Sequence, residues 1–212
     1  MKSSFYGILT VLLAFSSMSL AAPEPAIVQG PDQWTLKTTF THPQQIVLRR
    51  AEDNKLVRYW YIILTLTNNS KDDVYFYPEC QLVTDNFQII PAGKGIGSIV
   101  FERIKQRHKN TYPFLELLGM TDNKILQGED NTKDIAVIWP DFDHKAKNIQ
   151  IFISGLSNEI AVVNYPVKVD PEGDPKVVYL RKTLQLKYNI KGDPSSSTGA
   201  LLEYKGKSWI MR

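Results

Sequence analysis

A long period-two alternation of apolar and polar side chains constrains the fold of this chain more than any other feature. Between residues 60 and 66 every second position is a large apolar residue, and the alternate positions of the segment 56–67 are mainly Tyr and Thr. The apolar positions are Trp60, Ile62, Leu64 and Leu66. Because successive side chains of a strand point to opposite faces, this pattern predicts a long strand with one buried face. Six polar, turn-forming residues follow at 68–73 and an extended segment resumes at 74–77, which predicts a hairpin.

Short, turn-bounded segments of the same kind recur along the rest of the chain. They are centred on residues 34–40, 46–48, 81–85, 88–90, 135–139, 149–153, 160–165, 178–190 and 201–204. Their number and spacing are typical of an antiparallel β-sandwich. A doubly wound α/β fold is excluded because it needs helices that alternate with the strands. The prediction is a mainly β chain, an immunoglobulin-like antiparallel β-sandwich with a small helical insertion.

That insertion is predicted at about residues 93–126. Ser98 can cap a helix that runs to His108. Its inner face would carry Val100, Phe101 and Ile104. A shorter helix is expected between Thr111 and Gly119. We expect the insertion to cover an open edge or end of the sandwich, since exposed strand edges promote aggregation.

The N-terminus has the pattern of an export signal. Lys2 precedes an apolar run from Phe5 to Phe15, and Ala21-Ala22 supplies small residues for cleavage. This run is shorter than the ~20 residues of a transmembrane helix. Residues 1–22 are therefore predicted to be a signal peptide, and residues 23–212 a single soluble β-sandwich domain in the periplasm or outside the cell.

Composition excludes some partners of such a domain. The formal net charge is only +3, and cleavage of the signal peptide would remove Lys2, so a nucleic-acid partner is not expected. No apolar run after residue 22 is long enough to span a membrane. A basic cluster could touch anionic lipid or polysaccharide, although a solvated helix face is favoured. The cluster consists of Arg103, Lys105, Arg107, His108 and Lys109.

The single cysteine, Cys80, cannot form an internal disulfide. It precedes the apolar pair Leu82-Val83, which favours a small buried residue. A catalytic thiol would need a His partner in an electropositive site. The three histidines are scattered, and Gly155-Leu156-Ser157-Asn158 lacks the last Gly of a nucleophile elbow, so it is interpreted as a turn.

Two acidic clusters could each bind a metal ion, and each would imply an alternative function. Asp141, Asp143 and His144 are suitable ligands for a divalent transition metal and would make the protein a metal-assisted hydrolase. Asp170, Glu172 and Asp174 have the oxygen donors of a calcium loop and would make it a calcium-stabilised adhesion domain. Both segments are rich in turn-forming residues, and the sequence favours plain turns without a metal in each.

Lys182 interrupts an otherwise apolar face in the segment 178–190. A buried ammonium group needs a partner or loses its charge. We expect Lys182 to extend along the sheet to solvent, with a structural ion pair as one alternative and a ligand-binding or catalytic lysine as the other.

Residues 61–67 with the turn Asn68-Asn69-Ser70 resemble bacterial extracytoplasmic immunoglobulin-like families, the FxLYD-like and related lipoprotein domains. Residues 83–85 and 135–139 are similar to the next strands of that pattern, so the resemblance covers residues 56–155. The chain departs from it at the helical insertion and in lacking a lipid-anchoring Cys. Four segments also look like a family of exported bacterial proteins without an assigned activity: 128–133, 155–158, 181–184 and 207–212.

The resemblance implies a β-sandwich fold and an extracytoplasmic address, and it carries over no catalytic residues. We therefore expect no catalytic, cofactor-binding or metal-binding residues. The function expected is that of a non-catalytic binding or envelope-interaction module with a protein or glycan partner. The sequence leaves its oligomeric state open.

Overall fold

The computed structural model describes residues 32–50, 53–168, 175–193 and 200–212, and in this part the protein is mainly β with one α-helix. The predicted signal peptide, residues 1–22, lies outside the described residues. In the described part no helix is long and apolar enough to cross a membrane.

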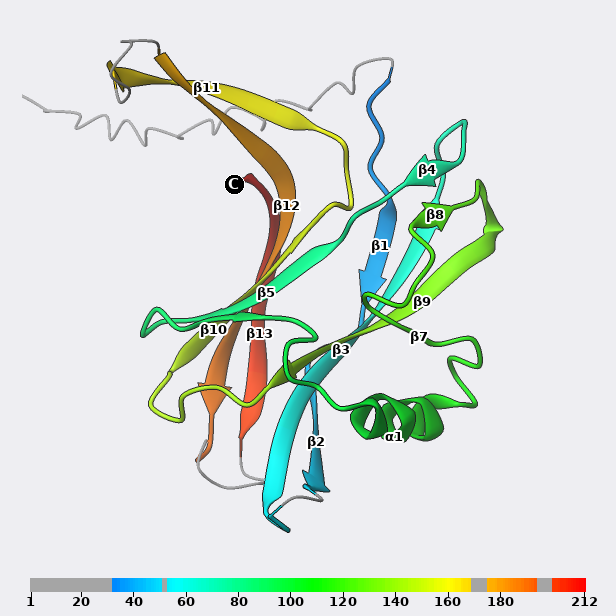
Figure 1. The fold of residues 1–212 in the computed structure, drawn as a ribbon, viewed down its shortest axis with the longest axis vertical. Helices are drawn as coiled ribbons and strands as arrows, with labels where there is room; N and C mark the ends of the chain where they lie inside the picture. The colour runs from blue at the N-terminus through cyan, green and yellow to red at the C-terminus, as the bar shows by residue number, and fades with distance from the viewer. Residues whose placement is uncertain (1–31, 51–52, 169–174, 194–199) are drawn as a thin grey trace, which may run out of the picture.

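Two mainly antiparallel sheets form the body (Figure 1). The first contains β1 (Lys37–Phe40), β2 (Gln44–Arg49), β3 (Leu56–Asn68), β7 (Glu116–Leu117) and β9 (Gly128–Pro140). Its order is β1-β3-β9-β7, and β2 also pairs with β3. The second contains β5 (Glu79–Thr84), β6 (Ile89–Pro91), β10 (Asn148–Ser154), β11 (Ile160–Lys168), β12 (Pro175–Lys191) and β13 (Leu201–Met211). Its order is β11-β12-β10-β5-β6, and β13 also pairs with β12.

The main core lies between the two sheets, which confirms the predicted sandwich. The even positions of β3 from Trp60 to Leu66 face this core, where they are almost completely buried. The second sheet contributes apolar side chains of β10 and β12, such as Ile151 and Leu186. Two layers that each turn one apolar face inward are the usual construction of a β domain.

The odd positions of β3 differ from the prediction of a half-buried strand. Tyr61 and Ile63 are fully buried, because α1 (Ser98–His108) lies over the outer face of the first sheet. Val100, Phe101 and Ile104 form the inner face of the helix, as predicted. The capping prediction was wrong: Gly97 is the N-cap, and no side chain caps the helix. The insertion thus covers a sheet face, and its β7 also pairs in parallel with the edge of β9.

Two further local predictions were wrong. No second helix forms between residues 111 and 119, where turns lead into β7. The polar segment after β3 does turn, held by the side chain of Asn68, whose Nδ2 donates to the carbonyl of Asp72 at 2.9 Å. However, the next strand, β4 (Val74–Tyr75), pairs with β8 (Lys124–Ile125) and not with β3, so no hairpin forms.

β12 is the longest strand and joins the upper and lower parts of the second sheet (Figure 1). Its first part pairs with β11, and its second part pairs with β10 on one side and β13 on the other. Lys182 lies where the pairing with β11 ends and the pairing with β13 begins.

Candidate functional site

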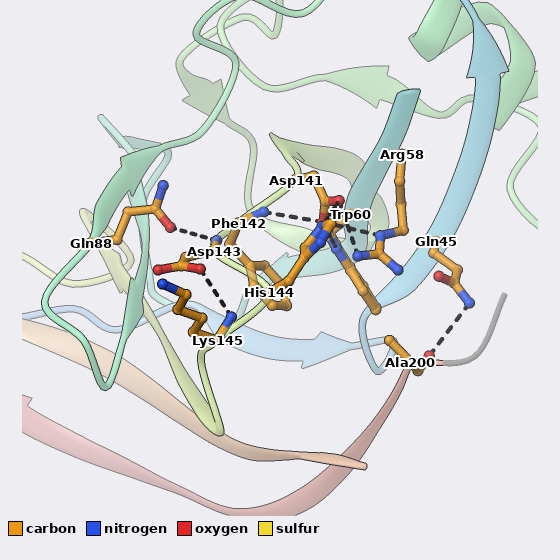
Figure 2. Close-up of polar contacts among 10 residues, drawn as sticks. All are labelled: Gln45, Arg58, Trp60, Gln88, Asp141, Phe142, Asp143, His144, Lys145 and Ala200. Atoms are coloured by element: carbon orange, nitrogen blue, oxygen red, sulfur yellow. Dashed lines mark hydrogen bonds and ion pairs between the residues drawn. The ribbon is translucent and has the colours of Figure 1, made fainter. Parts of the chain in front are cut away.

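The turn that follows β9 contains Asp141, Asp143 and His144, the candidate metal ligands of the sequence analysis, and Figure 2 shows their polar contacts. The carboxylate of Asp141 accepts hydrogen bonds from Arg58 Nε at 3.0 Å and from Trp60 Nε1 at 2.9 Å. Arg58 Nη2 lies 3.0 Å from the second oxygen of Asp141. The guanidinium is almost fully buried and lies over the Trp60 ring. Asp141 therefore neutralises a buried cation at the end of the core.

The other two side chains of this turn have different contacts. His144 Nε2 lies 3.0 Å from Asp141 Oδ2, with the ring about half exposed. The carboxylate of Asp143 instead accepts a hydrogen bond from the backbone N–H of Lys145 at 2.9 Å. In the part of the chain that the structure describes, no three His, Cys, Asp or Glu side chains are grouped to hold a metal ion. The calcium alternative, Asp170, Glu172 and Asp174, lies outside the described residues and stays a hypothesis.

Cys80 and two residues of the basic cluster, Arg107 and His108, make structural contacts, whereas Arg103, Lys105 and Lys109 are exposed. Cys80 is buried in the main core, as predicted, and burial raises the pKa of its thiol well above the ordinary value, which makes it a poor nucleophile. On α1, Arg107 Nη1 donates to the carbonyl of Gln45 at 3.1 Å and tethers the helix to β2. His108 Nε2 lies 2.9 Å from the hydroxyl of Tyr61. Burial, together with the charge of Arg107, lowers the pKa of His108 below 6.5.

Lys182 faces inward as the alternation predicted, but the expectation that its amino group reaches solvent was wrong. The ammonium forms an ion pair with Glu159, and the two side chains are only 10% and 6% exposed. Lys182 Nζ also donates to Thr35 Oγ1 at 3.3 Å and lies over the ring of Trp209. The partner was not identifiable from the sequence because Glu159 precedes β11 and meets Lys182 only through strand pairing.

The ion pair anchors a short stretch of chain that leads into β1. Thr35 pairs with Ser157 in an isolated antiparallel bridge. The hydroxyl of Thr35 lies 2.9 Å from Ser157 Oγ and 3.0 Å from Glu159 Oε1. Ser157 Oγ in turn donates to the carbonyl of Trp34 at 2.9 Å. These buried contacts fix the backbone of residues 34–36 against residues 156–159.

Asn158 completes this arrangement at the surface. Its Oδ1 accepts a hydrogen bond from the backbone N–H of Trp34, and its Nδ2 donates to the carbonyl of Asp32, each at 2.8 Å. Together the two contacts clamp the chain on either side of Gln33. These contacts hold the backbone around Trp34 in a floor made of two segments more than 120 residues apart in the sequence, whose contacts span 122 to 126 positions.

Two adjoining hollows lie over this floor, and we call them together the aromatic groove. The larger has a volume of about 870 Å³ and the smaller about 230 Å³. The larger is lined by residues 32–35, 69–75 and 158. The smaller is lined by Trp34, Tyr75, Tyr77, Gly155, Ser157, Asn158, Glu159, Ile160 and Arg181. Trp34, Tyr75 and Asn158 border both hollows, so the two form one continuous groove.

Tyr75 and Tyr77 project into the groove because the residues next to them are anchored in the core. Val74 and Phe76 are buried, and the N–H of Phe76 donates to the carbonyl of Asn123 at 2.9 Å. Alternation then turns the two tyrosines outward, where they are 60% and 66% exposed. Gly155 lets the chain come close on the other side, since a Cβ at this position would collide with the carbonyl oxygen of Tyr77. Its φ of +79° also favours glycine.

Sequence reasoning missed this groove. The alternation of residues 74–77 was visible, yet nothing in it told whether the Val and Phe or the two Tyr positions faced the core. The segment Gly155-Leu156-Ser157-Asn158 was interpreted as a plain turn, and it does form the turn between β10 and β11. Its role as one wall and part of the floor of a groove depends on contacts with residues 32–36 and 77.

No protein-family model, curated protein or solved structure matches this chain. The aromatic groove is therefore interpreted from its own residues and geometry.

Proposed function

We propose that this protein is an exported, non-catalytic binding module and that its ligand lies in the aromatic groove. The observation that carries the proposal is that Trp34, Tyr75 and Tyr77 border one groove, with both tyrosine rings largely exposed. Exposed aromatic rings that converge with a few polar groups are typical of ligand sites. Because the floor is fixed by buried contacts, little conformational entropy would be lost on binding, which favours affinity.

The polar groups of the groove support binding more than catalysis. Glu159 is held in its ion pair with Lys182, and the hydroxyls of Thr35 and Ser157 are hydrogen-bonded within the floor. Among the described residues no histidine lines either hollow. The hydroxyl groups and the Glu159 carboxylate of this lining are thus engaged within the fold, which favours binding over covalent catalysis.

Export is the second part of the proposal, and it rests on the N-terminal sequence. Cleavage after Ala22 would leave Pro23 as the first residue. Mass spectrometry of the protein from the envelope fraction tests this directly. A chain that retains residues 1–22 in the cytoplasm would overturn the proposed location.

The binding role can be tested by sedimenting purified protein with isolated bacterial cell envelopes. We expect the natural chain to sediment and the double variant Tyr75→Ser, Tyr77→Ser to remain largely in the supernatant. Both side chains are exposed, so the variant should keep its denaturation midpoint. Phe114→Ser is the matched control, because Phe114 is 85% exposed and does not line either hollow. Equal sedimentation of all three proteins would show that the groove is not the binding site.

Metal analysis of the purified protein separates this proposal from the two alternatives. We expect no stoichiometric metal. A bound transition metal would favour the hydrolase, and bound calcium would favour the adhesion domain.

A further inference from the structure

We infer that the ligand of the aromatic groove is an uncharged glycan, an extended chain of sugar rings that stack on Trp34, Tyr75 and Tyr77. The inference rests on the proposed function and names the class of ligand. Three properties of the groove carry it: the presentation of the rings, the polar groups between them and the sign of the charge.

The rings are presented in a way that suits flat, amphipathic units. A pyranose ring has a face of C–H bonds, which packs against an aromatic face, and a rim of hydroxyl groups, which must keep its hydrogen bonds. Tyr75 and Tyr77 project from the same side of an extended segment. Positions two residues apart in such a segment are separated by about 6.6 Å, a distance on the scale of one sugar unit. Trp34 borders both hollows and adds a third apolar surface.

The remaining lining supplies hydrogen-bonding groups rather than further apolar surface. In the larger hollow the aromatic rings and Val74 are surrounded by the polar residues 69–73 and by Asn158. Each half of the Asn158 amide uses one protein contact. Within the described part of the chain this leaves one N–H and one oxygen lone pair, because a side-chain amide has two donors and two acceptor positions. An apolar peptide or lipid would leave these groups unpaired, whereas sugar hydroxyls would satisfy them.

The charge of the larger hollow disfavours an acidic ligand. Its lining contains three carboxylates, from Asp32, Asp72 and Asp73, against the single ammonium of Lys71. Asp73 is paired with Lys124, 2.8 Å away, and this partner lowers the pKa of Asp73 so that it stays ionised at neutral pH. In the smaller hollow the cation Arg181 lies opposite the already paired Glu159. An anionic glycan would meet the carboxylates of Asp32 and Asp72 in the larger hollow, which outnumber the ammonium of Lys71, so an uncharged glycan is favoured.

The inference can be tested by affinity electrophoresis of the mature chain in native gels. The probes are three uncharged polysaccharides, hydroxyethyl cellulose, glucomannan and galactan, and one acidic polysaccharide, polygalacturonate. We expect at least one uncharged probe to retard the natural chain and polygalacturonate not to retard it. Titration with fragments of the retarding glycan should give affinities that rise with chain length from one to about three sugar units.

Variants of the groove residues test whether the glycan binds in the groove. Tyr75→Ser and Tyr77→Ser should each weaken binding of the retarding glycan by roughly tenfold, and Phe114→Ser should leave it unchanged. Retardation by polygalacturonate alone would overturn the assignment of an uncharged ligand. If no uncharged glycan retards the chain while envelope binding still depends on Tyr75 and Tyr77, the glycan is wrong and the binding role stands. If envelope binding is also independent of the two tyrosines, the proposed function itself fails.

Discussion

Replacement of Lys182 by methionine tests the buried contact beneath the aromatic groove. Methionine keeps most of the apolar stem of lysine and removes the ammonium group. Among the described residues, the carboxylate of Glu159, 6% exposed, would then keep the hydroxyl of Thr35 as its remaining side-chain partner. A buried charge left without its counter-ion costs about 3–5 kcal/mol. We expect Lys182→Met to lower the free energy of unfolding by this amount, a large part of the ~5–15 kcal/mol of an ordinary domain.

Urea unfolding followed by tryptophan fluorescence measures the effect. The matched control is Lys187→Met on the same strand, where the side chain is exposed, and its change should stay within about 0.5 kcal/mol. A double variant, Lys182→Met with Glu159→Leu, removes both charges and should recover much of the loss. If Lys182→Met costs less than about 1 kcal/mol, its ammonium reaches water in solution and the ion pair does not stabilise the fold.

Three further outcomes are expected from unfolding measurements. Asp141→Ala should cost about 3 kcal/mol because it removes the carboxylate that is ion-paired with the buried guanidinium of Arg58. His144→Ala, at the exposed side of the same carboxylate, should cost less than about 1 kcal/mol, and equal losses would contradict this interpretation of the turn. Leu64→Ala should cost about 2–5 kcal/mol through loss of core packing, and Thr65→Ala, on the other face of the strand, much less; similar midpoints would show that the faces of β3 are misassigned. Burial and a neighbouring guanidinium lower the pKa of His108 below its ordinary value of 6.5, so its contribution to the free energy of unfolding should be complete above pH 6.5 and be lost as the pH falls below that value. His108→Gln should make the urea midpoint depend less on pH between pH 7.5 and 5. An unchanged pH dependence of the midpoint would refute the assignment.

The local sequence pattern was sufficient to predict which face of a strand must be buried against the core. The inward face of β3 followed from alternation alone, since an apolar stripe of that length has to be buried. The outer face did not, because the burial of Tyr61 and Ile63 depends on α1, which comes about 35 residues later in the chain. The failed hairpin has the same cause. Nothing in residues 68–77 indicates that β4 pairs with β8, across the whole insertion.

The groove was beyond sequence reasoning for a related reason. Each of its residues has an ordinary local explanation: an Asn in a turn, two Tyr in a strand, a Trp before a strand. They form a groove only because residues 34–36 pair with residues 156–159, and no sequence periodicity predicts this contact. Lys182 was the one local signal, because a charge in an apolar face requires an explanation. Its partner, however, is set by the register of β11 against β12.

The pairing beneath the groove also determines the order in which parts of the protein can fold. Thr35 leaves the ribosome early, but its partners Ser157, Glu159 and Lys182 come more than a hundred residues later. Contacts of such separation form slowly, since the loop between them must be closed first. The segment that contains Trp34 therefore cannot pair until β10, β11 and the start of β12 have been synthesised. Binding competence would then appear only at the last stage of folding, so a chain truncated before residue 182 should have no working groove, although it contains all three aromatic rings.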